Sequence, residues 1–378
     1  MRIYLDHNAT TPLRPQVVDA MTSVLREDYG NPSSVYAEGA AARERIELAR
    51  QQLAALLGTK AERVRFTGGA TESNNTVLFG LLAPGDHVVT TEIEHPSVLE
   101  PLSELEARGV VVSRVPPDAS GCVSASSIED AMRADTKLVS MIWANNETGS
   151  IQPVEAVAEL CNERAIAFHV DATQAIGKVE VDLGRVAIDY VSSSAHKLGG
   201  PKGVGALVCR ENAKLPVLLY GGGQERGLRG GTENVAGIAG FGVACELASE
   251  SGALHREACA KLRDRLWQNL EARVGEVRWN GDPARTLSNT LNVEFQGAAG
   301  EVLVQALDLE GVAVSAGAAC HSGSIDPSKV LLAMGRSPEE ARSSLRFSVG
   351  WGVDEAQIDT VVALLCELVP RARKVEAP

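Results

Sequence analysis

Short apolar runs alternate with amphipathic segments along the first half of the chain. The runs predict strands at residues 63–67, 87–91, 110–115, 137–144, 166–171 and 189–194. Segments with apolar residues at helical spacing lie between several of them and predict helices at 68–82, 97–109 and 154–165. This β-α alternation with nearly continuous apolar strands is typical of a parallel sheet buried between helices.

The pattern changes after the middle of the chain. Residues 235–275 read as almost continuous helix, followed by a strand at 286–295, a helix at 300–311, a strand at 343–349 and a helix at 354–369. We therefore expect an α/β fold with a large domain, a long connecting helix and a smaller C-terminal α+β domain. No internal repeat or low-complexity segment interrupts this organisation.

Composition and charge narrow the class of protein. The 378 residues are 44% hydrophobic and 22% charged, which is typical of a globular protein with a large core. The net charge of -13 argues against nucleic acid or an anionic membrane as the main partner. The first residues, "MRIYLDHNATTP", lack a signal-peptide pattern, and no apolar run is long enough for a membrane span.

The seven cysteines are widely spaced, with no C-x-x-C pair that would indicate a zinc site or a dithiol redox motif. An odd number of cysteines without a signal peptide indicates reduced thiols, and hence a cytoplasmic protein. For any one of these cysteines, a small buried side chain is the default interpretation.

Polar residues of several kinds follow the predicted strands. In open α/β folds ligands bind beyond the carboxyl ends of the strands, so these residues are candidates for a site. In chain order they are Gly68-Gly69-Ala70-Thr71, His95, Asn145-Asn146-Glu147, Asp171 with Gln174, and His196-Lys197. Taken singly, each could be structural: Asp171 a turn residue, His95 a packed histidine, Lys197 a surface amine.

Together these groups match the needs of pyridoxal 5'-phosphate. The aldehyde needs a lysine such as Lys197, desolvated and held after "SSSAH" by the glycine turn that follows. The ring nitrogen needs a carboxylate such as Asp171 to stay protonated as an electron sink. An imidazole can stack on the ring, an amide can bond its phenolic oxygen, and a helix N-terminus with hydroxyls can bind its phosphate. The spacing of Asp171 and Lys197 fits one intervening helix-and-strand passage.

Ten stretches between residue 4 and about residue 350 resemble NifS/IscS-type cysteine desulfurases, in the class-V aminotransferase family of type I pyridoxal-phosphate enzymes. They are "YLDHNATTP", "GNPSSVY", "FTGGATESNN", "EHPSVL", "ANNETG", "HVDATQAIGK", "SSSAHKLGGPKG", "LRGGTENV", "VSAGAACHSGS" and "SSLRFSVG". The resemblance implies a mostly parallel seven-stranded sheet between helices. It also implies a large domain at 14–255, and a small domain made of 1–13 and 256–378.

The resemblance also implies roles for individual residues. Lys197 would form the Schiff base, Asp171 would pair with the ring nitrogen, Gln174 would bond the phenolic oxygen, and His95 would stack on the ring and move protons. The expected phosphate ligands are Ala70, Thr71, Ser194, His196 and, from the other subunit of a homodimer, Thr232. Asn146 and Arg346 would hold the substrate amino acid, with the planar guanidinium clamping its carboxylate.

Cys320 lies in "SAGAACHSGSID", where small residues predominate and suit a mobile loop. By resemblance to group I desulfurases, Cys320 is the nucleophile that becomes a persulfide. Ala316, Ala318, Ala319 and His321 depart from the usual serines and threonine around it. We expect protonated His321 to help hold the thiolate, and an unchanged thiol pKa in His321→Thr would contradict this.

The resemblance thus implies that L-cysteine displaces Lys197 from the cofactor, that Lys197 or His95 moves the α-proton, and that the Cys320 thiolate attacks the substrate sulfur. Alanine leaves, and the persulfide passes to an iron–sulfur scaffold or a sulfur-carrier protein. No metal is expected from this chain alone, although Cys320 could share a cluster with a scaffold. A selenocysteine lyase, a small-amino-acid aminotransferase and a non-catalytic sulfur-relay or scaffold protein remain alternatives.

Overall fold

A seven-stranded sheet forms the centre of the larger part of the molecule. The computed structural model describes residues 2–316 and 326–375. The strands lie in the order β2-β8-β7-β6-β5-β3-β4, and all neighbours are parallel except β8, which is antiparallel to both β2 and β7. The mostly parallel sheet is therefore confirmed. Its strands are β2 (Val64–Thr67), β3 (His87–Thr91), β4 (Val111–Val115), β5 (Thr136–Ile142), β6 (Ala167–Asp171), β7 (Tyr190–Ser194) and β8 (Gly205–Cys209).

Two features of the sheet differ from the sequence pattern. Strand β8 was not singled out, because its segment "GALVC" is short and follows a glycine-rich turn. The expected helix between β6 and β7 was wrong, since residues 172–189 contain only turns and isolated bridges. Gly177 takes a φ of 79° there, a left-handed conformation that interrupts a helix soon after Gln174.

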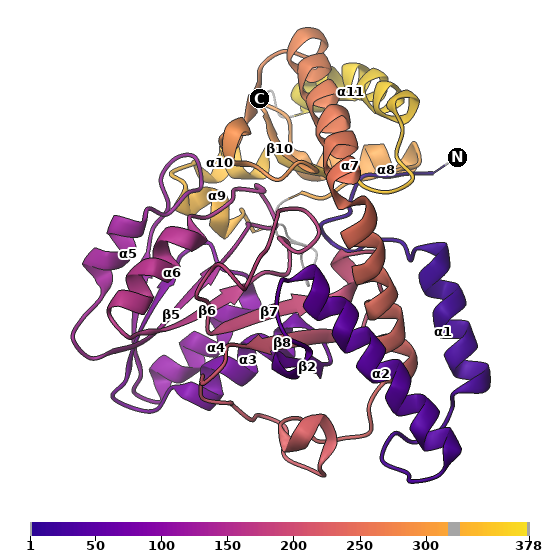
Figure 1. Cartoon of the computed structure of the whole chain (residues 1–378). Coiled ribbons are helices and arrows are strands. Elements are labelled where there is room, and N and C mark those ends of the chain that lie inside the picture. Colours follow the sequence, from indigo (N-terminus) through magenta and orange to yellow (C-terminus); the bar gives the residue numbers. More distant parts are fainter. Residues whose placement is uncertain (1, 317–325, 376–378) are drawn as a thin grey trace.

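Helices cover both faces of the sheet. Figure 1 shows α5 and α6 on one side of the strands, and α3 and α4 on the other. Successive side chains of β5 point to opposite faces of the sheet. Val139 therefore packs in the core cluster of one face, and Leu138 packs in the core cluster of the other. The helices of this part are α1 (Pro15–Glu27), α2 (Ala37–Leu56), α3 (Ala70–Leu81), α4 (Pro96–Ala107), α5 (Ala125–Ala131) and α6 (Val154–Glu163).

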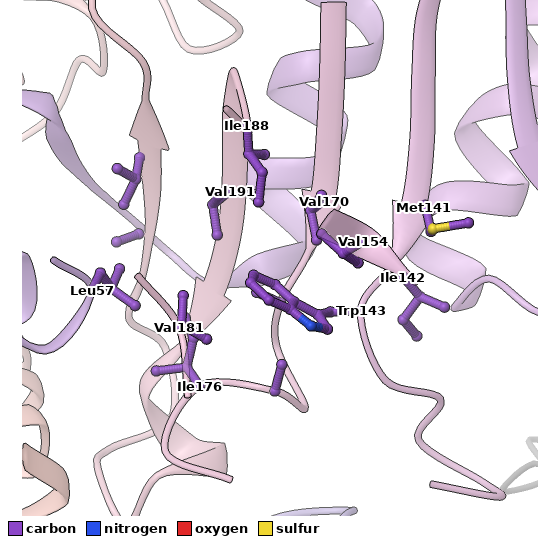
Figure 2. Close-up of a cluster of buried hydrophobic side chains, with 14 of the residues drawn as sticks. Leu57, Met141, Ile142, Trp143, Val154, Val170, Ile176, Val181, Ile188 and Val191 are labelled. Carbon is purple, nitrogen blue, oxygen red and sulfur yellow. The ribbon is translucent and has the colours of Figure 1, made fainter. Parts of the chain in front are cut away.

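The main core lies between the sheet and the layer that contains α6. Figure 2 shows part of it, with Trp143 surrounded by aliphatic side chains that include Val170, Val191 and Val181. The exposed fraction of Trp143 is 5%, and Val170 has no exposed surface. Aliphatic packing of this kind fixes the strand ends that carry the polar residues of the site.

The smaller part contains its own sheets and a second core. An antiparallel sheet has the order β12-β10-β9, and β1 pairs with β11 in a separate parallel ladder. The elements are β1 (Ile3–Tyr4), β9 (Val277–Trp279), β10 (Thr290–Phe295), β11 (Val312–Ala313), β12 (Ser344–Ser348), α8 (Gly300–Leu309), α9 (Lys329–Ala333), α10 (Pro338–Arg342) and α11 (Glu355–Val375).

Helix α7 (Val235–Arg273) joins the two parts, as the long helical pattern predicted. Figure 1 shows it running from beside the sheet to the smaller part. Cys245 belongs to the core of the larger part, whereas Cys259 and Leu262 belong to the core of the smaller one. The expected domain limits stay a prediction. None of the described helices is long and apolar enough to cross a membrane.

Candidate active site

The predicted strand-end residues lie along one edge of the sheet. Asp171 is the last residue of β6, and it pairs in register with Ile142 of β5 and Ser192 of β7. Ser194 ends β7, and the 3-10 turn Ala195–Lys197 follows directly. His95 caps the N-terminus of α4 just beyond β3. Ligands of open α/β folds bind where parallel strands end, so these side chains are candidates for a single site.

Lys197 is held by the N-terminal segment of the chain. Its Nζ donates hydrogen bonds to the carbonyl oxygens of Asn8, at 2.6 Å, and Ala9, at 2.7 Å. Burial and, to a lesser extent, the Arg346 guanidinium lower the pKa of this amine to about 8, while Asp6 and Asp171 oppose the change. An amine with such a pKa is partly neutral near physiological pH, as a nucleophile and a base require.

A chain of hydrogen bonds joins Asp171 to His95. Asp171 is buried, and its Oδ2 accepts a bond of 2.8 Å from Asn74 Nδ2. The same amide donates to Ser97 Oγ at 2.8 Å, and this hydroxyl lies 2.8 Å from His95 Nδ1. The Thr173 backbone N–H donates to the other carboxylate oxygen of Asp171 at 3.0 Å. Two neutral donors thus fix the orientation of the Asp171 carboxylate.

The same contacts define the tautomer of His95. The Ser97 backbone N–H donates to His95 Nδ1 at 3.0 Å, so Nδ1 is an acceptor and the neutral ring carries its proton on Nε2. The ring is accessible to solvent, yet desolvation by the surrounding protein still lowers its pKa; Asp171 opposes this shift and Lys197 adds to it. A neutral His95 with an Nε2–H group can stack on a ring or donate a proton.

The N-terminus of α3 forms an anion cradle. The first amide groups of a helix have no intrahelical acceptor, so those of Ala70 and Thr71 are available to a phosphate. A Cβ atom on Gly69 would lie 3.9 Å from Ser194 Oγ, which places that hydroxyl beside the cradle. A Cβ atom on Gly205 would lie 2.7 Å from Gly69 Cα, so only glycine allows β8 to approach so closely. His196 follows Ser194, and its Nδ1 lies 3.1 Å from Thr10 Oγ1.

Gln174 and Lys197 share one acceptor, the backbone oxygen of Asn8, which the sequence pattern does not indicate. Gln174 Nε2 donates to the carbonyl oxygen of Asn8 at 2.9 Å, the same atom that accepts from Lys197. Lys178 Nζ donates to Gln174 Oε1 at 2.5 Å. This bond fixes the orientation of the Gln174 amide, so that its NH2 group faces the carbonyl oxygen of Asn8. Asn8 stood within "YLDHNATTP", but nothing in its local pattern marked it as a site residue.

Arg346 and Asn146 also come together, as expected for substrate-binding residues. Arg346 Nη1 donates to the backbone oxygen of Asn146 at 3.0 Å, and Nη2 donates to Asp6 Oδ1 at 2.6 Å. The exposed fraction of Arg346 is 5%, and its Nε is buried without a hydrogen-bond partner among the described residues. A buried N–H group without an acceptor is costly, and a ligand carboxylate would satisfy it. Asp6 was not foreseen either.

Two expected residues are not joined to this cluster. Thr232 is exposed in the described part of the chain. Its assignment to the other subunit's phosphate stays a prediction. Cys320 lies in the segment 317–325, outside the described residues, as do Ala318, Ala319 and His321. Their expected roles, including the shared cluster at Cys320, also stay predictions.

The whole chain is similar to known proteins. Residues 3–361 match the family described as aminotransferase class-V. The chain belongs to the class-V aminotransferase family. It is 42% identical to "Cysteine desulfurase IscS" of Clostridium botulinum, over 99% of this chain and 96% of that protein. It is also 41% identical to the protein of the same name from Methanosarcina thermophila, over 99% of this chain and 93% of that protein.

Solved structures of the family have the same fold. A structure titled "NIFS-LIKE PROTEIN" superposes with a TM-score of 0.92 at 37% identity, covering 98% of this chain and 100% of that one. A structure titled "SspA in complex with cysteine" has a TM-score of 0.81 at 36% identity, covering 93% of this chain and 99% of that one. The expected fold class and family are confirmed.

The cofactor of this class-V enzyme is pyridoxal phosphate, and the described residues fit it. The unpaired Nε of Arg346 and the open N-terminus of α3 indicate sites for a carboxylate and a phosphate. Asp171, with both carboxylate oxygens accepting neutral donors, suits a protonated ring nitrogen. Lys197 supplies the amine. The donor set thus contains each kind of group that the cofactor needs.

Proposed function

We infer that this chain is a cysteine desulfurase, which removes sulfur from L-cysteine and releases L-alanine. The observation that carries this inference is the convergence of Lys197 and Arg346 on residues 6–9. The backbone oxygens of this segment accept both hydrogen bonds from Lys197, and its Asp6 forms the ion pair with Arg346. Asn8 Nδ2 also donates to the backbone oxygen of Asn146 at 3.2 Å. An amine and a carboxylate clamp are thus held by one short stretch, as an amino-acid substrate requires.

Each residue has a proposed task in this reaction. The Arg346 guanidinium binds the substrate carboxylate, and Asn146 lies beside it. Pyridoxal phosphate supplies a carbonyl for the substrate amine and a ring that takes up electrons from the α-carbon. Lys197, with its lowered pKa, removes the α-proton as an amine. His95 donates from Nε2, because its Nδ1 is already occupied by the Ser97 N–H.

The nucleophile that we propose is Cys320, whose thiolate attacks the sulfur of cysteine. The carbon–sulfur bond breaks, its electron pair stays with the carbon skeleton that becomes alanine, and the sulfur remains on Cys320 as a persulfide. Buried cysteines are poor candidates, since burial raises the pKa of Cys161 and Cys209 to about 12.

The persulfide has a proposed destination. We propose that an iron–sulfur scaffold or a sulfur carrier accepts it, and that the enzyme works as a cytoplasmic homodimer. The relatives named for IscS support the first part. The six cysteines among the described residues are free, which agrees with a reducing compartment. Thr232 would complete the phosphate site of the second protomer.

Release of alanine and sulfide from L-cysteine, with a reductant present, tests the proposal. The wild-type holoenzyme should make both in equal amounts, and Cys320→Ala should make neither. Cys366→Ala is the matched control, because this half-buried cysteine lies on α11 and should be dispensable.

Other results would favour the alternatives. Full activity of Cys320→Ala with an amino-group acceptor would indicate an aminotransferase. Strong preference for L-selenocysteine over L-cysteine would indicate a selenocysteine lyase. A protein that develops no visible absorption band with the cofactor would be a relay or scaffold protein.

A further inference from the structure

A cavity lies behind Lys197, between the N-terminal segment, helix α7 and the turn after β12. The hollow contains about 730 Å³ of empty space, part of which is open to solvent. Lys197 lines it from one side, but Asp171, His95, Thr71, Gln174 and Arg346 do not. The cavity therefore adjoins the active site at Lys197, but the other residues expected to hold cofactor and substrate do not line it.

The walls of this cavity are positively charged, although the protein as a whole is acidic. Arg14, Lys178, Lys197 and Arg256 line it together with His7 and His255, and no Asp or Glu is among the described lining residues. This lining contrasts with the net charge of -13 of the whole chain. A concave cationic surface attracts an anion.

Lys178 is the central group of this wall. Its Nζ donates to Asn8 Oδ1 at 3.1 Å and to Gln174 Oε1 at 2.5 Å, and no carboxylate pairs with it among the described residues. Burial, together with the nearby charges of Lys197 and Arg346, lowers its pKa to about 7, although Cys259 opposes this shift. Buried charges in proteins are normally paired, but among the described residues the Lys178 ammonium has no counter-charge. Two of its three N–H groups have acceptors, and the third has none there.

His7 provides an independent sign of a ligand. Its exposed fraction is 3%, and its Nε2 is buried without a hydrogen-bond partner among the described residues. Nδ1 lies 3.1 Å from the carbonyl oxygen of Ser348, which can only accept, so in the neutral ring Nε2 carries the lone pair. Burial lowers the pKa of His7 and favours that neutral ring, although the backbone carbonyls of Ser348 and Trp351 oppose this shift. The free acceptor calls for a hydroxyl donor.

Apolar groups complete the cavity. Leu198, Leu247 and Val349 line it, and Trp351, which is 45% exposed, stands at its rim with the Arg14 guanidinium 5.0 Å from its ring centre. We propose that this cavity is a second ligand site, which binds a small organic carboxylate bearing a hydroxyl group. The carboxylate pairs with Lys178 and Arg14, the hydroxyl donates to His7, and the carbon chain packs on the apolar wall.

Calorimetric titration of the holoenzyme with 3-hydroxybutyrate tests the site without reference to turnover. We expect saturable binding of one ligand per chain, and roughly tenfold or greater weakening in Lys178→Met, because a hydrogen-bonded charge pair is lost. Arg14→Gln is the second variant, in case Lys178→Met does not fold. Butyrate, which lacks the hydroxyl, should bind the wild type more weakly than 3-hydroxybutyrate does. The two ligands should bind His7→Phe with equal affinity.

Matched experiments separate this site from the active site. Arg346→Lys should keep its affinity for 3-hydroxybutyrate, and saturating L-alanine should not compete. Competition by L-alanine, or loss of binding in Arg346→Lys but not in Lys178→Met, would overturn the proposal and assign the ligand to the active site. Tight binding of inorganic phosphate with none of 3-hydroxybutyrate would also overturn it. These results do not depend on whether sulfide is released.

Discussion

Arg346 Nη2 lies 2.6 Å from Asp6 Oδ1, and this ion pair ties strand β12 to the segment that follows β1. The Arg346 side chain is 6% exposed and that of Asp6 is 20% exposed, so the pair is largely shielded from water. Asp6 and the Asn146 carbonyl occupy the two terminal nitrogens, which fixes the plane of the guanidinium and leaves Nε for a ligand. Asp6 thus positions Arg346, the residue that we propose as the substrate clamp.

Asp6→Asn should raise the KM for L-cysteine roughly tenfold with a smaller change in kcat, because a less constrained guanidinium binds the carboxylate less well. Steady-state sulfide release measures both constants. Asp308→Asn is the control, since it removes the exposed Arg2–Asp308 pair. A lower KM in Asp6→Asn would show instead that Asp6 competes with the substrate carboxylate for Arg346.

Capture of the cofactor by the apoprotein should depend on the protonation of Lys197. Its pKa is lowered from 10.5 to about 8, chiefly by burial, so the neutral, reactive amine accumulates as the pH rises through about 8. We expect the rate at which the visible band grows, when pyridoxal phosphate is added to apoprotein, to rise through that pH.

Arg346→Met sharpens this test. Arg346 is the second cause of the lowered pKa of Lys197, so the midpoint should move to higher pH in the variant. A rate that still rises toward pH 10 in the wild type would mean that the amine is not desolvated. Lys197→Ala serves as the blank for non-covalent uptake of the cofactor.

The strand-end argument predicted much of the site for a clear physical reason. Parallel strands end at one edge, so Asp171, His95 and Lys197 had to meet there once the strands were recognised. Asn8 and Asp6 could not be found this way, because they lie in an irregular N-terminal segment that reaches the site only through the packing of β1 beside β11. Backbone carbonyls, such as that of Asn8, carry no signal in side-chain chemistry at all.

Asn74 escaped notice for a different reason. It lies in the helical pattern of α3, where a polar residue is usually a solvated one, yet it has no exposed surface and bonds Asp171. The length of the connection from β6 to β7 predicts a helix, but the connection is not helical. Gly177 adopts a left-handed conformation there, which the length of the connection does not reveal. Tertiary contacts, not local periodicity, decide such positions.

Asn74→Asp should impair the cofactor site by adding a charge. A second buried carboxylate 2.8 Å from Asp171 would raise the pKa of one member of the pair and weaken the ion pair with the ring nitrogen. We expect activity to fall roughly tenfold or more, since one pKa unit corresponds to a tenfold change in ionisation. The visible band of the holoenzyme should shift as well.

Asn74→Ser separates charge from the lost hydrogen bond. This neutral variant removes the amide without adding a carboxylate, so its band should stay near that of the wild type. Equal loss of activity and equal band shifts in both variants would mean that Asn74 acts only by filling space beside Ser97.

The last prediction concerns the segment that carries Thr232. Glu225 and Arg226 both adopt left-handed conformations, with φ of 44° and 60°, which are unfavourable for residues other than glycine. Arg50 holds Glu225 through two bonds of 2.8 Å, and the Phe66 backbone N–H donates to the same carboxylate at 2.9 Å. Both side chains of the ion pair are buried.

Glu225→Gln should therefore lower the free energy of unfolding by about 3 kcal/mol, because it leaves Arg50 buried without its counter-charge. It should also weaken cofactor binding, because the loop that leads to Thr232 loses its anchor. Urea unfolding and titration of apoprotein with pyridoxal phosphate measure the two effects. Glu47→Gln is the matched control: it removes the exposed partner of the same Arg50, 3.1 Å away, and should change stability by less than about 0.5 kcal/mol. A destabilised Glu225→Gln protein with unchanged cofactor affinity would show that the anchor serves the fold alone and that Thr232 is placed by other contacts.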